Sequence, residues 1–148
     1  MTHVGKQVCD AFVQALGAAG TECDDRVSHR RFFPQSETVT ADAIVSSPLE
    51  DINPMSQAPV LYERTITVNV TARFTGDEDG LDDRAWRFQS LAEAAIAATN
   101  DLGGLAQTVF LRSRTSAADG SGHRAVLTCA LQYTVLVYTR DGEPETAL

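Results

Sequence analysis

Apolar and polar residues alternate most regularly between residues 61 and 74. One face of this segment is apolar, whereas the other carries Thr, Asn and charged side chains. A period of two with one apolar face predicts a half-buried strand, which is typical of an antiparallel sheet. The apolar face comprises Tyr62, Ile66, Val68, Val70, Ala72 and Phe74.

Two further strands are predicted near the C-terminus. Residues 124–139 alternate in the same way, and residues 109–115 form a shorter apolar segment before them. The polar, glycine-containing stretch SAADGSGH at 116–123 predicts a flexible hairpin loop between the two. Together with the strand at 61–74, these segments supply most of the expected sheet.

Two segments instead have apolar residues at three- and four-residue spacing, which predicts amphipathic helices. The first covers residues 3–19, and Gly20 stands where a helix is expected to end. The second covers residues 81–99 and ends in the stretch 100–104, where two glycines tolerate positive φ. Helices therefore precede and interrupt the predicted strands.

The remaining segments are less regular. Residues 26–33 predict a short strand that Pro34 stops, and residues 37–46 predict a weaker extended segment. Residues 46–60 contain three prolines and several polar residues, so we expect a mobile loop there. Residues 140–148 are mostly polar, and we expect them to be a frayed tail.

This element order predicts an α+β fold within a single domain over residues 1–148. We expect a mixed, mostly antiparallel sheet with two helices packed on one face. The other face of the sheet would then be rich in threonine and bare, so that it meets either water or another subunit.

The composition argues against two classes of protein, those that grip nucleic-acid phosphates and those that span a membrane. The chain has 148 residues and a formal charge of −8, and proteins that grip nucleic-acid phosphates cluster Lys and Arg instead. No apolar run reaches the length of about 18 residues that a membrane span needs. The N-terminus also lacks the pattern of a signal peptide, so we expect a cytosolic origin and no membrane partner.

The residue types that carry most catalysis form no recognisable motif. Three widely spaced cysteines without a CxxC pair argue against a disulfide framework or a zinc site. The three histidines share no ligand spacing, and neither a nucleophile elbow, a P-loop nor a dinucleotide fingerprint is present. We therefore expect no catalytic residues, no cofactor, no metal and no enzymatic activity.

The stretch FTGDEDGLDDRAWRF at 74–88 is the strongest candidate for chemistry because it holds five carboxylates. A calcium loop of EF-hand type with Gly80 at its sixth position needs a glutamate at its twelfth, which is Trp86 here. A structural interpretation fits better: Asp79 is expected to cap the second helix, with Asp82 three residues later. The carboxylates in the first turn then suit the helix dipole.

Two sets of residues are candidates for contact with a partner. HRRFFP, at residues 29–34, combines arginines with aromatic residues, which are enriched in interface hot spots. The same stretch is equally compatible with a strand that buries one Phe and exposes its arginines. The candidate interface residues are Arg30, Arg31, Phe32 and Phe33, with Glu63, Thr65 and Thr67 on the predicted bare face of the sheet.

The order of these elements resembles the tail terminator (minor tail) proteins of long-tailed bacteriophages. An amphipathic helix leads to RVSHRRFFP, then to a loop and to the strand LYERTITVNVTARF. The acidic turn, the helix LDDRAWRFQSLAEAAIAAT and the strand RAVLTCALQYTVLVYTR follow. The resemblance covers nearly the whole chain and rests on element order, length and texture rather than on one motif.

The resemblance implies a structural virion protein without enzymatic activity. Such proteins assemble as a hexameric ring that caps the tail tube, ends its polymerisation and offers a surface to the head connector. The implied partners are further copies of the chain, the tail tube protein and the head connector or neck proteins, in the virion tail and, during assembly, in the host cytoplasm. DNA would be passing cargo only.

Two alternatives remain open. One is a phage head-completion or neck protein, which is of similar size and binds the portal complex. The other is a small α+β enzyme or ligand-binding domain, which would require a deep cavity with converging His29, Cys23 or Asp77.

Overall fold

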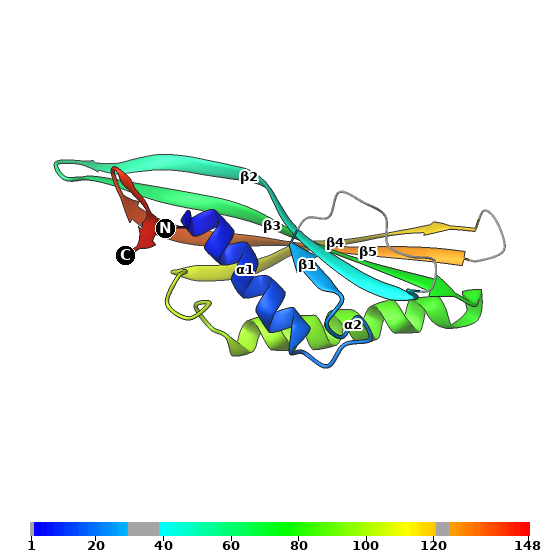
Figure 1. Cartoon of the computed structure of the whole chain (residues 1–148). Coiled ribbons are helices and arrows are strands. Elements are labelled where there is room, and N and C mark those ends of the chain that lie inside the picture. The colour runs from blue at the N-terminus through cyan, green and yellow to red at the C-terminus, as the bar shows by residue number, and fades with distance from the viewer. Residues whose placement is uncertain (1, 30–38, 121–124) are drawn as a thin grey trace.

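The computed structural model describes residues 2–29, 39–120 and 125–148 (Figure 1). These residues form one α+β unit of two helices and six strands, with polar turns between them. In chain order the elements are α1 (Val4–Gly17), β1 (Val27–His29), β2 (Ala41–Gln57), β3 (Val60–Gly76), α2 (Glu78–Ala98), β4 (Thr108–Asp119), β5 (Ala125–Arg140) and β6 (Glu143–Ala147).

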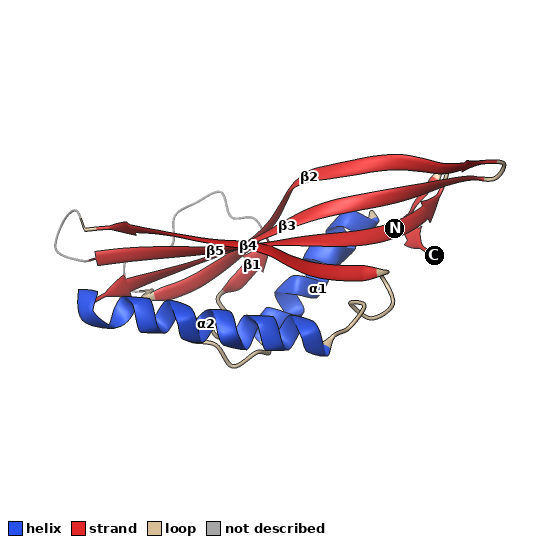
Figure 2. Ribbon diagram, turned by 180° about the vertical axis from the view of Figure 1, so that it is seen from behind, coloured by secondary structure: helices blue, strands red, loops and turns tan. Residues whose placement is uncertain are grey.

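The strands form one mixed sheet in the order β1-β2-β3-β5-β4, with β6 added at one end of β5. Among the described strands, only β1 and β2 pair in parallel, and the other pairs are antiparallel. Both helices lie on the same side of this sheet (Figure 2). The prediction of a mixed, mostly antiparallel sheet with two helices on one face is therefore confirmed.

The core lies between the helices and the alternating side chains of β3 and β5. Phe12 of α1 meets Tyr133 of β5 edge to face, and Phe88 of α2 meets Phe74 of β3 in the same way. Burying each large apolar side chain contributes about 1.5–3 kcal/mol, so these contacts fix the helices to the sheet. The face of β3 assigned from the sequence is fully buried at Ile66, Val68, Val70, Ala72 and Phe74.

The expected mobile loop at residues 46–60 is wrong, because these residues continue β2, turn at Ala58–Pro59 and begin β3. Prolines misled the prediction, since they remove backbone donors and usually exclude a central strand. Here Pro48 falls where the β2–β3 register shifts, and Pro54 stands opposite Tyr62 in a part of β2 that pairs, among the described residues, with β3 alone. An edge strand tolerates such missing donors.

The expected frayed tail at residues 140–148 is wrong as well, because residues 143–147 form β6 against β5. Gly142 adopts a φ of +77° in the turn that reverses the chain. The amide of Leu148 donates to the carbonyl of Tyr138 at 2.9 Å, and Gln7 of α1 donates to the carbonyl of Glu145 at 2.8 Å. Backbone pairing and this side-chain bond hold the polar tail in place.

The acidic turn also differs in detail. Helix α2 begins at Glu78, and its N-cap residue is Asp77, whose side chain makes no capping hydrogen bond. The predicted cap at Asp79 is therefore wrong, because the helix starts earlier and Asp79 lies inside its first turn. Strand β4 likewise continues to Asp119, so it is longer than the predicted strand at 109–115.

Candidate functional site

The distal half of the β2–β3 hairpin is the most unusual surface of the molecule, and we call residues 48–62 the arm. Its tip extends beyond both helices (Figure 1). Three large apolar side chains on it are about half exposed: Leu49 at 53%, Ile52 at 47% and Met55 at 54%. Folding of the single chain thus leaves this apolar surface in water.

The exposed apolar residues of the arm occupy both of its faces. Leu49 stands opposite Thr67, whose side chain belongs to the bare face of the sheet. Ile52 stands opposite Arg64, which belongs to the face that bears the helices. Residues directly opposite each other on paired strands point to the same face. A partner that covered this surface would therefore meet the arm from its edge or surround it.

A buried arginine fixes the base of the arm. Arg64 is only 7% exposed, and its Nε donates to the hydroxyl of Thr139 at 2.8 Å. Its Nη1 lies 3.0 Å from Glu50 Oε1 on β2 and 3.3 Å from His3 Nε2 before α1. Charge-assisted bonds of this kind are about twice as strong as neutral ones. The arm is therefore tied to β5 and to the N-terminus at one point.

Arg64 was not predicted from the sequence as a functional residue, although its place in the alternating pattern of β3 indicates that it is buried. It stands in phase with Ile66 and Val68, so strand alternation alone places a charged residue on the buried face. A charge at such a position needs a partner, because burying it unpaired is costly. Only the structure identifies that partner as Glu50, since the segment that holds it was expected to be a loop.

The predicted interface residues of β3 lie on the bare face, between β2 and β5. Thr65 stands between Asp51 and Leu136, and Thr67 between Leu49 and Thr134. Glu63 stands one position further toward the tip of the arm, and all three are half-buried. The structure brings this part of the predicted site together. The other part, Arg30, Arg31, Phe32 and Phe33, lies outside the described residues.

The opposite edge of the sheet carries arginines that stack on aromatic rings. On the bare face, the Arg112 guanidinium lies 5.1 Å from the centre of the Phe110 ring, and its Nε donates to the Thr134 hydroxyl at 3.3 Å. On the helix side, the Arg114 guanidinium lies 3.8 Å from the centre of the Trp86 ring. Phe110 and Trp86 are both 48% exposed. This edge is thus basic and aromatic in a chain whose net charge is negative.

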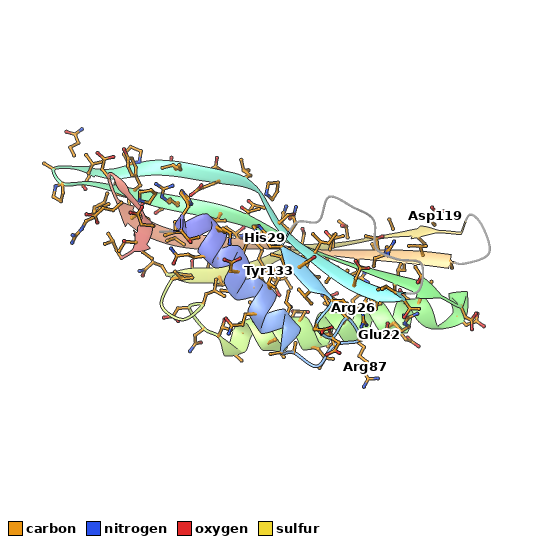
Figure 3. All side chains as sticks on the ribbon, in the orientation of Figure 1. Glu22, Arg26, His29, Arg87, Asp119 and Tyr133 are labelled. Carbon is orange, nitrogen blue, oxygen red and sulfur yellow. The ribbon has the colours of Figure 1, made fainter. Side chains whose placement is uncertain are left out.

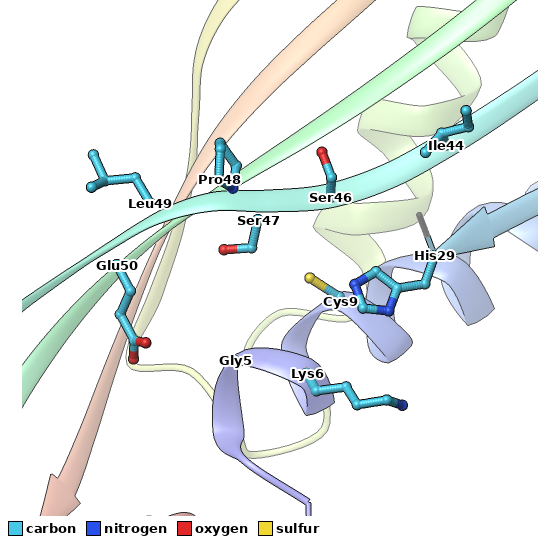
Figure 4. A pocket seen from close by; sticks show the side chains of 10 residues that line it. All are labelled: Gly5, Lys6, Cys9, His29, Ile44, Ser46, Ser47, Pro48, Leu49 and Glu50. Atoms are coloured by element: carbon cyan, nitrogen blue, oxygen red, sulfur yellow. The ribbon is translucent and has the colours of Figure 1, made fainter. Parts of the chain in front are cut away.

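A groove of about 660 Å³ separates α1 from the bend of β2 (Figure 4). Lys6, Cys9, His29 and Glu50 are among its lining residues. Burial raises the pKa of the Cys9 thiol to about 11, with a smaller contribution from Asp10. A thiol with such a pKa remains protonated near neutral pH and is a poor nucleophile. The groove therefore lacks an activated cysteine.

The residues named for the enzyme alternative lie in different surroundings. His29 lines the groove, whereas Cys23 is fully buried in the core, and Asp77 borders a separate hollow beside Arg84. Burial raises the pKa of Cys23 to about 12. No hollow formed by the described residues is lined by more than one of these three residues.

Two side chains near the start of α2, Asp82 and Arg84, make structural contacts. Asp82 accepts a hydrogen bond from the Trp86 indole at 3.2 Å. Arg84 pairs with Glu22 and donates to the carbonyls of Thr75 and Thr40, each at 3.1 Å. Within residues 2–29, 39–120 and 125–148, no group of three or more His, Cys, Asp or Glu side chains could hold a metal ion.

Comparison with known proteins adds little to this geometry. No family model matches the sequence, and no curated protein does. Among solved structures, a chain of the virion of a native gene transfer agent particle is similar with a TM-score of 0.35 and 16% sequence identity. The similarity covers 90% of this chain and 92% of that chain. A similarity with so low a TM-score does not assign a function to this chain.

None of the helices in the described part of the chain is long and apolar enough to cross a membrane.

Proposed function

We propose that this chain is a structural subunit of a phage-type virion and acts without catalysis. Its copies form a hexameric ring on the end of the tail tube, which stops tube growth and offers a surface to the head connector. The element order that resembles tail terminator proteins supports this proposal, and so does the arrangement of the exposed surfaces.

The observation that carries the proposal is the arm. Three large apolar side chains on one projecting hairpin are about half exposed, and a neighbouring chain that buried them would gain stability from the apolar area removed from water. A subunit of a permanent assembly covers such a surface with its neighbours. Leu49, Ile52 and Met55 are therefore interface residues in this proposal.

Charge supports the same role. The formal charge of −8 gives phosphates few anchors, so DNA can pass through a ring of these chains without being held. The tube protein and the connector are then the partners that the ring contacts. The protonated Cys9 thiol in the groove supports a role without nucleophilic catalysis.

The test is polymerisation of the cognate tail tube protein with and without this chain, followed by electron microscopy. We expect shorter tubes that stop growing and carry the chain as a ring at one end. Unchanged tube length with no chain at the ends contradicts the proposal. Binding to the purified portal complex and not to the tube would instead support a head-completion protein.

A further inference from the structure

A hollow of about 320 Å³ lies between α2 and β4, toward the opposite edge of the sheet from the arm. Tyr133 of β5 is one of its lining residues, and Glu93 is the only charged side chain among those described that line it. The other walls are mostly apolar and include Ile96, Ala97, Val109 and Leu111.

Tyr133 has a polar group without a partner in this hollow region. Its side chain is only 4% exposed and packs edge to face on Phe12, yet its hydroxyl forms no hydrogen bond with any described residue. A buried hydroxyl that lacks a hydrogen bond costs free energy, so the hydroxyl of a buried Tyr usually has a partner. The hollow therefore combines apolar walls with one unsatisfied donor.

We infer that the tip of the arm, residues 52–60, occupies this hollow in the next copy of the ring. Met55 of one copy packs between the apolar walls of the next, and an oxygen of the tip accepts a hydrogen bond from the Tyr133 hydroxyl. This inference rests on the proposed ring and names the contact that joins its copies.

The chemistry of the tip suits the hollow. Met55 is 54% exposed, and an unbranched methionine adapts to irregular apolar gaps. Asn53 and Gln57 are exposed as well, and their amide oxygens can accept a hydrogen bond. Residues 52–62 contain no charged side chain, so the tip brings no charge that would have to be buried beside Glu93.

The position of the tip leaves it free to reach a neighbour. Strand β1 ends at His29, which is level with Val45, and Met55 lies ten residues further along β2, or roughly 30 Å away. The tip thus stands clear of β1 and of both helices. Contact between the tip and the hollow joins two different surfaces, and repetition of such a contact closes a ring if the rotation between copies closes.

The arm cannot fill the hollow of its own chain. Pro54, beside Met55, is level with Thr139, which lies six residues along β5 from Tyr133. Six residues of a strand span roughly 20 Å, whereas a disulfide needs Cα atoms within about 7 Å. A disulfide between the tip and the hollow therefore forms only between two chains.

Disulfide crosslinking of Met55→Cys with Ala97→Cys tests the contact directly. The native cysteines Cys9, Cys23 and Cys129 are all buried, which leaves the introduced thiols as the reactive pair. The double variant is oxidised in free solution and on tail tubes and separated without reductant. We expect a ladder of covalent oligomers that ends at the closed ring, and monomers only for each single variant.

The matched control is Met55→Cys with Arg87→Cys, because Arg87 is exposed on α2 and points away from the sheet (Figure 3). This control should form no ladder. Capped tubes without a ladder for the test pair overturn the inference but leave the proposed function intact. Dimers of the Met55→Cys single variant indicate contact between two tips and overturn it as well. If the chain fails to cap tubes, the proposed function fails, and the ladder in free solution still decides whether the tip enters the hollow.

Removal of the unpaired hydroxyl provides a second measurement. Tyr133→Phe should leave the free energy of unfolding of the single chain undiminished, because the hydroxyl has no partner among the described residues. The same variant should weaken the association of copies about three- to tenfold, measured as the chain concentration at which half of the tubes carry a ring. A loss of stability with an unchanged concentration would show that the hydroxyl serves the fold instead.

Blocking the hollow is the third measurement. Ala97→Phe fills the space with a large side chain at an exposed position, so it should abolish the ring and leave the chain folded. Ala94→Phe is its matched control, because Ala94 is exposed on the same helix and is not among the residues that line the hollow. Normal rings with Ala97→Phe contradict the inference.

Discussion

The two halves of the β2–β3 hairpin share one ladder but differ in what covers them. In the proximal half, Ala43, Val45, Ala72 and Phe74 are fully buried below the helices. In the arm, the same two strands keep their pairing, yet Leu49, Ile52 and Met55 are about half exposed. One half is therefore stabilised by its own core, whereas the other depends on backbone pairing, one buried ion pair and, in our proposal, a neighbouring subunit.

The largest expected effect comes from the proximal half. Phe74→Ala should lower the free energy of unfolding by about 3–5 kcal/mol, because it opens a cavity against Phe88. Urea denaturation followed by circular dichroism measures this loss. The control in the arm, Met55→Ala, should change the free energy by less than about 0.5 kcal/mol. Equal losses for the two variants would contradict the comparison.

The second largest effect is expected at Arg64, which lies at the boundary between the two halves. Arg64→Ala should cost about 2–4 kcal/mol, since it leaves Glu50 and the Thr139 hydroxyl without their partner in a poorly hydrated region. Hydrogen exchange should also become faster in the arm than in the proximal half. Lys6→Ala removes the exposed ion pair with Asp10 and should cost at most about 1 kcal/mol. A loss as small for Arg64→Ala would show that the buried pair does not fix the arm.

Alkaline pH should destabilise the core that covers the proximal half, through the buried thiols of Cys9 and Cys23. Thiols in the unfolded chain have a pKa near 9. In the folded state, burial raises the pKa of Cys9 to about 11 and that of Cys23 to about 12. Above pH 9 the unfolded state binds fewer protons, so the free energy of unfolding falls as the pH rises. At pH 10 we expect a loss of about 1 kcal/mol per thiol. The measurement is urea denaturation at pH 8 and pH 10, where Cys9→Ala should show a smaller decrease than the parent chain; an equal decrease would contradict the assignment.

The smallest effect on folding is expected in the arm. Ile52→Ser should change the free energy of unfolding by less than about 0.5 kcal/mol, because the side chain is already 47% exposed. The same variant should reduce the fraction of tubes that carry a ring. Thermal unfolding and electron microscopy measure the two quantities on one preparation. A clear loss of stability with normal capping would assign Ile52 to the core rather than to an interface.

The sequence predicts those parts of the fold that follow from a regular hydrophobic period. Strand β3 and the strand path of β5 are read from alternation, and both helices from three- and four-residue spacing. The arm is not predicted from such a period, because Pro48, Pro54 and Pro59 are typical of a loop and because its large apolar residues are exposed rather than part of the core. Its extended form follows from the ladder with β3, whose register shifts at two places and therefore follows no simple hydrophobic period.

The candidate site is predicted only in part for the same reason. Thr65 and Thr67 lie on the bare face because strand alternation fixes which way they point. The level of the arm relative to β4 depends on three registers between strands, and each register is set by packing and turns rather than by composition. Local patterns therefore predict which face of the sheet a side chain occupies, whereas the order and register of the strands follow only from tertiary pairing.

The buried Arg64 has a mechanical consequence for the arm. The contacts of Arg64 with Glu50, Thr139 and the ring of His3 join the base of the arm to the rest of the fold. A load on the tip is thereby transmitted to β5 and to the start of α1 instead of bending the hairpin alone. In a ring built from such subunits, tension at one joint would pass through each subunit to the next.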